Sequence, residues 1–360
     1  MTLPARHPLN SGATASAPLV KHYRGARDGS RPVWFMRQAG RSLPEYRAIR
    51  ATIGMLDSCL TPDVASEITL QPVRRHAVDA AIFFSDIVIP LKLAGLPIDI
   101  VAGVGPVLDD PIRRREDLER LQPLDPASLD PIREAVGLTV DALGQTPLIA
   151  FGGAPFTLAS YLIEGGPSKT LPVSRALMAE DPETWRDILT WCGEVTSQFI
   201  RAQVESGASA LQVFDSWAGR LSPDDYRGFA QPHSATLLAS LSDLTDADGV
   251  AVSRVHFGVG TGEILTDMFD AGATVMGVDA DTPLGVASDM FGHRVPLQGN
   301  IRTEALEWPW EKLRDHVDDV MAQGSVAPGH VVNLGHGVPK DTDPDVLTRL
   351  VAHIHEGASA

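Results

Sequence analysis

The sequence predicts an α/β protein folded as a single (β/α)8 barrel of the TIM type, and three observations carry this prediction. Short apolar runs rich in β-branched and aromatic residues recur eight times along the 360-residue chain. A turn and then a segment with the spacing of an amphipathic helix follow these runs. Continuous apolar strands that alternate with helices are typical of a parallel sheet covered on both faces. Eight such units fit a closed barrel.

The predicted strands and helices follow in order along the chain. The strands lie at 33–37, 80–85, 147–151, 210–214, 254–258, 274–278, 295–298 and 330–334. The helices lie at 62–77, 131–143, 183–205, 223–241, 261–271, 283–291, 303–322 and 343–356. Helix starts are marked where an N-cap residue precedes a proline or an acid, as at Thr282-Pro283 and Thr303-Glu304. A doubly wound open sheet is the alternative fold, but it would need fewer strands.

The remaining length is assigned to an insertion and a tail. Residues 96–108 (LPIDIVAGVGPVL) alternate with glycine breaks and predict a hairpin inserted after the second strand. No linker rich in Pro, Gly or Ser divides the chain, so residues 21–357 are expected to form one catalytic domain. Residues 1–20 contain no acid and are rich in Ser, Ala and Pro. We expect a disordered N-terminal tail there, with a transit peptide as the alternative.

Composition restricts the partners of the protein. The formal charge of −16 and a pI near 5.0 argue against binding to nucleic acid or to an anionic membrane, which both need a basic surface. No apolar run reaches the roughly 18 residues of a membrane-spanning helix. Cys59 and Cys192 are the only cysteines and lie far apart in sequence. They suggest neither a disulfide framework nor a thiolate metal site, which fits a cytoplasmic protein.

Residues 21–50 are basic although the protein as a whole is acidic. Eight Lys and Arg residues oppose two acids in this segment. The stretch RQAGR, 37–41, directly follows the first predicted strand. Guanidinium groups bind carboxylates and phosphates as planar forks. Arginine at the start of a helix opposes the helix dipole, so its position there has no structural benefit. The segment therefore predicts a binding site for a polyanion.

Other polar residues occur where predicted strands end, and in a barrel those ends form the active site. Asp86 ends the apolar run FFSD, where a buried carboxylate is costly unless it is hydrogen-bonded or faces a cation. A capping role and a functional role are both open for it. Ser216 lacks the G-x-S-x-G elbow of a serine hydrolase. His336 lies between two glycines that allow close approach of a ligand.

Seven stretches taken in this order resemble the uroporphyrinogen decarboxylase family. They cover roughly residues 20–355, and they are PVWFMRQAGRSLPEYR, LQPVRRHAVDAAIFFSDI, GGAPFTLASYLIEGGPSK, QVFDSWAG, HFGVGTGEIL, LQGN and NLGHGV. The resemblance implies a homodimeric barrel without metal or organic cofactor. It implies a reaction of porphyrin (haem) biosynthesis in which the four acetates of uroporphyrinogen III become methyls, giving coproporphyrinogen III and four CO2.

The resemblance also assigns site residues by motif. Asp86 matches the residue that stabilises the transition state. The proton donor stays open between Arg37, His336 and a held water. The positions matched to substrate binding are Arg37, Gln38, Ala39, Gly40, Arg41, Arg50, Asp86, Tyr161, Ser216 and His336.

Two other functions are compatible with such a barrel. A zinc-dependent corrinoid or thiol methyltransferase needs His and Cys ligands, but the segment His256-Phe257-Gly258 has no cysteine nearby. A non-catalytic tetrapyrrole carrier would keep the arginines but would not require Asp86. Release of CO2 from uroporphyrinogen distinguishes the enzyme from the carrier.

Overall fold

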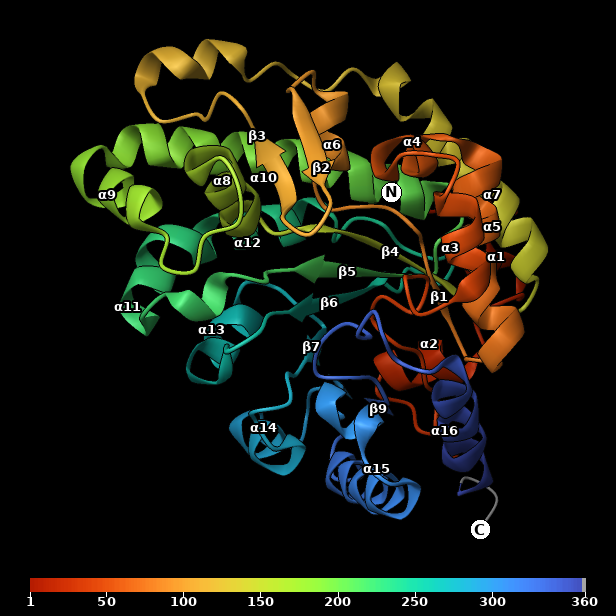
Figure 1. The fold of residues 1–360 in the computed structure, drawn as a ribbon. Helices are drawn as coiled ribbons and strands as arrows, with labels where there is room; N and C mark the ends of the chain where they lie inside the picture. The colour runs from red at the N-terminus through yellow and green to blue at the C-terminus, as the bar shows by residue number, and fades with distance from the viewer. Residues whose placement is uncertain (358–360) are drawn as a thin grey trace.

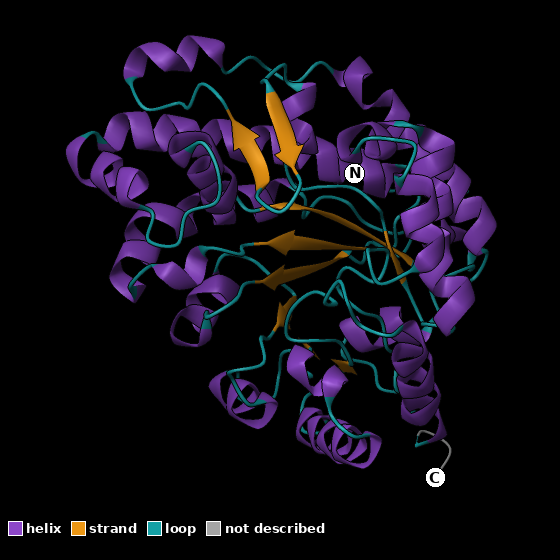
Figure 2. Ribbon diagram, viewed as in Figure 1, coloured by secondary structure: helices purple, strands orange, loops and turns teal. Residues whose placement is uncertain are grey.

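A computed structural model describes residues 1–357, and its centre is one curled sheet of seven parallel strands in the order β1-β4-β5-β6-β7-β8-β9. Helices lie around the outside of this sheet (Figures 1 and 2). The strands are β1 Ala81–Ile82, β4 Leu148–Gly153, β5 Ala210–Phe214, β6 Ser253–Phe257, β7 Val275–Gly277, β8 Leu297–Gln298 and β9 His330–Val331. Because all seven run parallel, their carboxyl ends share one edge of the sheet.

The first predicted strand makes contacts at the two edges of this sheet. Val33 forms an isolated parallel bridge with Val332, and the Trp34 amide donates to the Val332 carbonyl at 3.2 Å. On the other side, the Asp79 amide donates to the Val33 carbonyl at 2.9 Å. The segment therefore lies between the end of β9 and the approach to β1.

Two further strands form a separate antiparallel pair. β2 (Ile98–Val101) and β3 (Gly105–Leu108) pair with Ile98 opposite Leu108. The Leu108 amide donates to the Gly165 carbonyl at 3.0 Å, directly after α8 (Pro155–Glu164). This pair thus lies beside α8, away from the seven-stranded sheet (Figure 1).

The long helices follow the predicted spacing. They are α5 Pro62–His76, α7 Asp130–Leu143, α10 Pro182–Glu205, α15 Trp310–Gly324 and α16 Pro344–Glu356. Proline suits the first turn because its fixed φ is helical and its missing N–H has no partner there. The side chain of Asp181 caps α10 by accepting from the Thr184 amide at 3.1 Å. The shorter helices include α3 Pro44–Arg50, α4 Met55–Leu60, α6 Ile89–Leu93, α9 Pro172–Glu180, α13 Leu265–Asp270 and α14 Leu284–Met290.

The segment 223–241, predicted as one helix, is interrupted. It contains α11 (Pro223–Asp225), a π-helical turn at Tyr226–Ala230 and α12 (Gln231–Ser240). Pro232 has no amide hydrogen to donate to the carbonyl four residues earlier, so the regular hydrogen-bond series cannot pass through it. A widened turn is a common response to such a break.

Residues 1–20, expected to be a disordered tail, instead pack onto the fold. They form α1 (Pro8–Ser11) and begin α2 (Pro18–Tyr23). Leu3, Leu9 and Leu19 are buried, and the ring of His7 hydrogen-bonds the Val204 carbonyl at 2.9 Å near the end of α10. The expectation was wrong because a few well-spaced leucines anchor a segment whose average composition resembles that of a linker.

A row of buried polar side chains crosses the interior of the sheet. The indole of Trp34 donates to the Tyr23 hydroxyl at 3.2 Å, and that hydroxyl donates to Gln298. The Gln298 amide then donates to Gln212 at 2.9 Å. Each group has a partner, as buried polar groups require, so the row links α2 to the segment 33–36, to β8 and to β5. No helix among residues 1–357 is long and apolar enough to cross a membrane.

Candidate active site

The site is formed by turns at the carboxyl edge of the sheet. Its polar residues follow the segment 33–36, β1, β5 and β9, and one further residue is on α8, which begins directly after β4. Chain segments far apart in sequence therefore place their side chains at one edge. The carboxyl edge of a parallel α/β sheet is where active sites occur, both in barrels and in open sheets.

Arg37 occupies an unusual backbone position that the neighbouring chain supports. Its φ of 60° lies in the left-handed region, which side-chain-bearing residues rarely adopt. The Gln38 amide closes the turn by donating to the Phe35 carbonyl at 3.0 Å, and the Val338 amide donates to Met36 at 2.8 Å. A Cβ on Gly337 would lie 2.4 Å from Cδ of Arg37. The glycine therefore leaves the space that the arginine side chain fills.

Asp86 lies within electrostatic reach of Arg37. Its Oδ1 accepts from the Val88 amide at 3.1 Å, and its carbonyl accepts from the Ile89 amide at the start of α6. Burial raises the pKa of Asp86, while the Val88 amide and the positive charge of Arg37 act in the opposite direction. The carboxylate is thus poorly solvated, and N–H donors from a ligand would stabilise its charged form.

Tyr161 and Trp217 form an aromatic wall of the site. Their ring centroids are 4.4 Å apart, with the planes tilted by 39°. Burial raises the pKa of Tyr161 to about 12, and the nearby Asp86 carboxylate acts in the same direction. The phenol is therefore neutral near pH 7 and acts as a hydrogen-bond donor.

A buried aspartate shapes the turn that carries Ser216. Asp215 is completely buried, and its Oδ1 accepts from the Thr157 hydroxyl at 2.8 Å. The Thr157 oxygen accepts in turn from the Trp217 amide at 3.3 Å. His256, also buried, has its Nε2 3.6 Å from Oδ2 of Asp215. Ser216 is half-buried at the surface of this turn.

His336 lies on the glycine-flanked loop after β9. The Gly337 amide donates to its Nδ1 at 2.7 Å, so Nδ1 is an acceptor and the proton of the neutral ring is on Nε2. Partial loss of solvation and the charge of Arg37 both lower the pKa of His336. The ring is neutral near pH 7 and presents an Nε2–H donor.

The RQAGR segment divides between two directions. The Gln38 side chain is fully buried, accepting from the Phe35 amide at 3.0 Å and donating to the Ala80 carbonyl at 3.1 Å. The side chain points into the fold, and the contact of Gln38 with substrate that the resemblance implies stays a prediction. Ala39 and Gly40 are half-buried in the same turn. A Cβ on Gly40 would lie 2.8 Å from the Arg37 carbonyl, which explains the glycine.

Arg41, on the loop after Arg37, and Arg50, at the end of α3, line a basic pocket. Its volume is about 510 Å³. The pocket is lined by Arg41, Tyr46, Arg47, Arg50, Ala51, Lys340 and Asp341. Arg47 holds the loop by donating to the carbonyls of Arg41 and Ser42 at 2.8 and 3.0 Å. Arg41 is exposed and Arg50 half-buried. The lining contains four cationic side chains and one acid, so the pocket can bind several carboxylates of one ligand.

Sequence reasoning identified the strand ends but missed supporting residues. Thr157 and Trp217 act through contacts with other segments, and no local pattern marks such contacts. Asp215 carries a signal, because it is an acid at the end of an apolar strand. Among residues 1–357, no cluster of three or more His, Cys, Asp or Glu side chains has the arrangement of a metal site. Burial raises the pKa of both cysteine thiols, Cys59 and Cys192.

Comparison with known proteins identifies the family of the chain. A model of the uroporphyrinogen decarboxylase family (URO-D) matches residues 14–357. The uroporphyrinogen decarboxylase of Arthrobacter sp. (strain FB24) is 57% identical over 344 residues, covering 96% of this chain and 98% of the relative. That of Leifsonia xyli subsp. xyli is 54% identical over 364 residues, covering 97% of each chain.

Solved structures show the same fold in more distant proteins. A methyltransferase from Methanosarcina mazei superposes with a TM-score of 0.77 at 18% identity, covering 95% of this chain and 98% of that one. A B12-independent methionine synthase from Shewanella sp. W3-18-1 gives a TM-score of 0.53 at 10% identity, covering 92% and 95%. At these identities the likeness concerns the fold alone. The match of the family across residues 14–357 and the relatives above 50% identity show that this chain belongs to the uroporphyrinogen decarboxylase family.

Proposed function

We propose that this chain converts the four acetate side chains of uroporphyrinogen III to methyls, releasing four CO2 and coproporphyrinogen III. The observation that carries the proposal is family membership over nearly the whole chain, with relatives of that name that are 57% and 54% identical. The chain is thus a carboxy-lyase of porphyrin biosynthesis. The zinc-dependent methyltransferase is not favoured, because the structures that suggest it resemble this chain only in fold.

The arginines bind and orient the substrate in this proposal. Uroporphyrinogen carries eight carboxylates, and the net charge of −16 would repel it unless the site supplied positive charge locally. Arg37 provides a cation beside Asp86, while Arg41 and Arg50 face the adjoining basic pocket. The Tyr161 hydroxyl and the His336 Nε2–H add neutral donors. Fixed orientation of this kind places one acetate at the reacting position.

Asp86 stabilises the charge that develops during the reaction. Protonation of the pyrrole carbon beside the acetate gives a cationic ring, and this ring accepts the electron pair that remains when CO2 leaves. The resulting methylene carbon then takes up a proton to become the methyl, and the ring carbon loses the proton that it gained, which restores the neutral pyrrole. A carboxylate that accepts the pyrrole N–H groups stabilises the cationic ring. The poor solvation that raises the pKa of Asp86 also means that these donors would replace missing water contacts.

The protonation state of His336 bears on which group donates the proton. A histidine with a lowered pKa and an acceptor Nδ1 is suited to hydrogen-bond a carboxylate through Nε2. Arg37 is a poor acid, because the pKa of a guanidinium is above about 12. We therefore assign His336 to binding and favour a water held at the site as the donor.

The same proposal includes a closed eight-stranded barrel and a homodimer. The contacts of Val33 with Val332 and Asp79 support residues 33–36 as an eighth strand that closes the barrel. The β2–β3 pair would then be the hairpin inserted after the second strand. The family resemblance supports one catalytic domain over residues 21–357, a homodimer and a cytoplasmic location.

Anaerobic incubation of the purified protein with uroporphyrinogen III tests this function. We expect coproporphyrinogen III and four CO2 per substrate without added metal or cofactor. Binding of uroporphyrinogen without CO2 release would identify a carrier instead. Stoichiometric zinc together with thiol methylation would revive the methyltransferase.

A further inference from the structure

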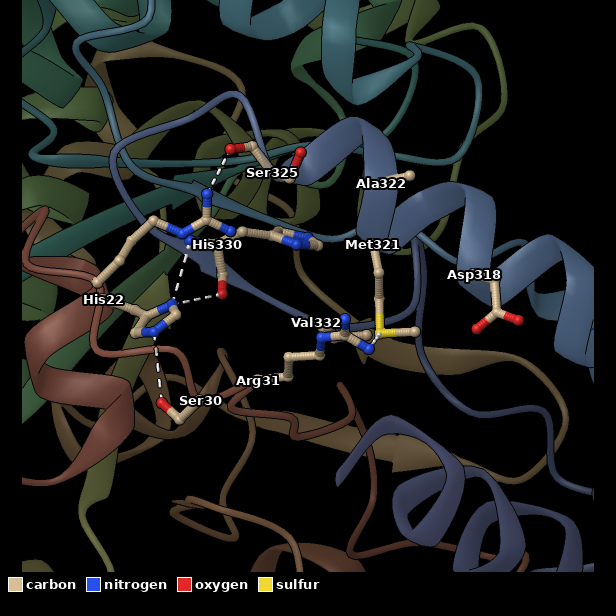
Figure 3. Close-up of a pocket in the computed structure, with 10 residues that line it drawn as sticks. His22, Ser30, Arg31, Asp318, Met321, Ala322, Ser325, His330 and Val332 are labelled. Carbon is tan, nitrogen blue, oxygen red and sulfur yellow. Dashed lines mark hydrogen bonds between the residues drawn. The ribbon is translucent and has the colours of Figure 1, made fainter. Parts of the chain in front are cut away.

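We propose a second ligand site, for a small oxyanion, in a pocket at the amino-terminal end of the sheet. The pocket has a volume of about 310 Å³ and lies between α2, α15 and the start of β9 (Figure 3). It is lined by His22, Arg27, Ser30, Arg31, Asp318, Met321, Ala322, Ser325, His330 and Val332. Most of these residues precede the segment 33–36 or β9, or begin β9, so the pocket lies at the opposite end of the strands from Asp86.

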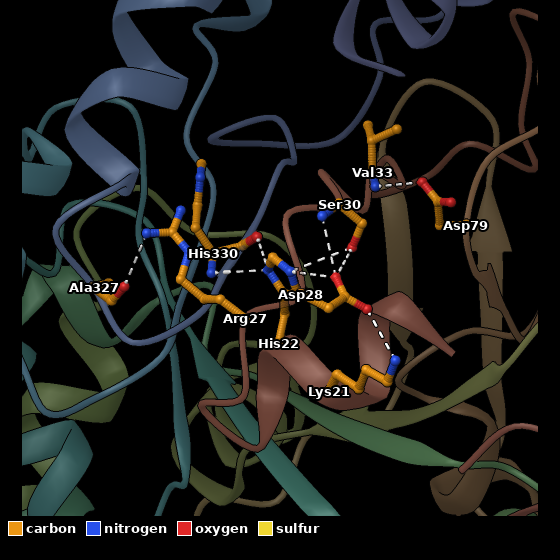
Figure 4. Close-up of polar contacts among 9 residues, drawn as sticks. All are labelled: Lys21, His22, Arg27, Asp28, Ser30, Val33, Asp79, Ala327 and His330. Carbon is orange, nitrogen blue, oxygen red and sulfur yellow. Dashed lines mark hydrogen bonds and ion pairs between the residues drawn. The ribbon is translucent and has the colours of Figure 1, made fainter. Parts of the chain in front are cut away.

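Two arginines supply positive charge to this pocket. Arg27 donates through Nη1 to the carbonyl of Ser325. It also donates, at 3.5 Å, to the carbonyl of Ala327 (Figure 4). Nη1 of Arg31 approaches Sδ of Met321 at 3.7 Å. Neither guanidinium forms an ion pair with a carboxylate of residues 1–357. Neutral carbonyl and thioether groups hold the two guanidinium groups in place, so the positive charge of both arginines is not neutralised.

The nearby carboxylates already have other partners. Asp28 pairs with Lys21 at 3.1 Å and accepts from the Ser30 hydroxyl. Asp318 pairs with Nε2 of His353 at 2.7 Å. Asp28 is held by the Lys21 cation and contributes little negative potential, so Asp318 is the one acid among the residues that line the pocket. Two arginines against one acid give the lining a net positive charge, which is unusual in a protein with a net charge of −16.

Buried histidines give the pocket a fixed floor. Nδ1 of His22 lies 2.8 Å from the His330 carbonyl oxygen and 3.3 Å from the His330 amide, and the side chain is 1% exposed. Nε2 of His330 hydrogen-bonds the Gly299 carbonyl at 2.7 Å. Burial lowers the pKa of both rings, that of His330 to about 4, so neither adds charge near pH 7. A preformed floor avoids the cost of ordering the site on binding.

Size and lining define the class of ligand. A pocket of about 310 Å³ is at the lower limit of small-molecule sites and does not suit a tetrapyrrole. Met321 and Val332 provide an apolar wall opposite the guanidinium groups. Phosphate and carboxylate both match the planar fork of arginine. The ligand is therefore a small molecule with a phosphate or carboxylate group, distinct from the substrate.

Thermal unfolding with added anion tests this site. Inorganic phosphate and, separately, succinate are titrated at constant ionic strength, with chloride as the replaced ion. The variants are Arg31→Gln, Arg27→Gln, Arg37→Gln and Arg6→Gln. Arg6 is exposed and matches the charge change outside the pocket. Arg37→Gln separates anion binding at the active site. Circular dichroism verifies that each variant is folded.

For the native protein, Arg6→Gln and Arg37→Gln, we expect a saturable rise in Tm with at least one anion. For Arg31→Gln, the anion concentration that gives half of the Tm rise should increase about tenfold or more, because a charge-assisted contact is lost. If Arg31→Gln does not fold, the same shift in Arg27→Gln supports the site. The proposal is overturned if the half-saturating anion concentration is unchanged in Arg27→Gln and in any folded Arg31→Gln. It is also overturned if the Tm response is lost only in Arg37→Gln. So does the absence of a saturable response to both anions.

Discussion

At the scale of single residues, Arg37 connects the candidate site. Its charge affects the pKa of Asp86, Tyr161 and His336, which come from three different segments. The basic character of this position was readable from the sequence. The opposite direction of Gln38 was not, because the left-handed backbone at Arg37 reverses the path of the chain. Local spacing predicts which residues are near a strand end, but not which way each side chain points after such a turn.

The role of His336 can be tested by comparing two substitutions. Glutamine places an amide N–H donor near the position of Nε2 but cannot transfer a proton. We expect His336→Gln to keep most turnover, with KM raised a few-fold. His336→Ala should weaken binding by about 1 kcal/mol, the value of one hydrogen bond. Steady-state kinetics near pH 7 measures both. Loss of kcat by orders of magnitude in both variants would make His336 the proton donor and contradict its assignment to binding.

At the scale of elements, the turn after β5 depends on close backbone approach. A Cβ on Gly219 would lie 2.2 Å from the Val259 carbonyl oxygen and 2.5 Å from that of Gly260. Gly228, in the π-helical turn, has nothing within 4 Å of its Cβ position. This difference between the two glycines is not visible in the sequence, because the segment that approaches Gly219 is forty residues away along the chain.

The variant Gly219→Ala should therefore be damaging and Gly228→Ala nearly neutral. Because the obstructing atoms are backbone, the strand ends must separate, at a cost of about 1–3 kcal/mol in the free energy of unfolding. The shift would also move the turn that carries Ser216 and Trp217, so KM should rise. Gly228→Ala should change stability by less than about 0.5 kcal/mol. Urea unfolding of both variants measures this, and equal stability would show that the turn is not constrained as described.

Helix α16 is attached to the first-strand segment through a titrating pair. Nε2 of His355 lies 2.8 Å from Oδ2 of Asp79, which also accepts from the Val33 amide at 2.8 Å. The hydrogen bond to Asp79 raises the pKa of His355. The folded state thus binds this proton more tightly than the unfolded state does. The contribution to stability is complete below the unfolded pKa of about 6.5 and is lost as pH rises through the raised folded pKa.

Substitution of His355 by Gln should remove this pH dependence. The side chain is 39% exposed, so screening limits the effect to about 0.2–1 kcal/mol. We expect the unfolding free energy of the native protein to exceed that of His355→Gln by the largest amount at about pH 6, and by less at about pH 9. Urea titrations at both values measure the difference. A gap that widens with rising pH would have the wrong sign for this pair.

At the scale of the whole molecule, the distribution of charge can be tested by salt. The net charge of −16 repels an octacarboxylate, while the arginines near the site attract it. Because screening weakens both effects, the response shows which one dominates at close range. We expect kcat/KM to fall as ionic strength rises, mainly through KM, because the arginines are closer to the ligand. Activity assays from about 0.05 to 0.5 M salt measure this. A rise in kcat/KM would mean that the overall negative charge governs association.

The sequence predicted the parallel α/β fold well, and its errors have physical causes. Alternating apolar runs and helices predicted a parallel sheet because burial on both faces leaves a clear pattern. Strands such as β1 and β8 have only two residues each, because an apolar run marks burial and not the residues that join the hydrogen-bond ladder. The packing of residues 1–20 was missed, because a few buried leucines decide it against the average composition. The candidate site was found through strand ends, whereas its supporting contacts required the fold.

The most direct test of the central claim is turnover by Asp86→Asn with uroporphyrinogen III under anaerobic conditions. The amide keeps the shape of the carboxylate but cannot stabilise a cationic pyrrole. We predict normal folding by circular dichroism and a loss of about 10²–10³ in kcat, roughly 3–4 kcal/mol. The control Asp63→Asn, exposed in the first turn of α5, should release CO2 at the native rate. Near-native CO2 release by Asp86→Asn would contradict the account.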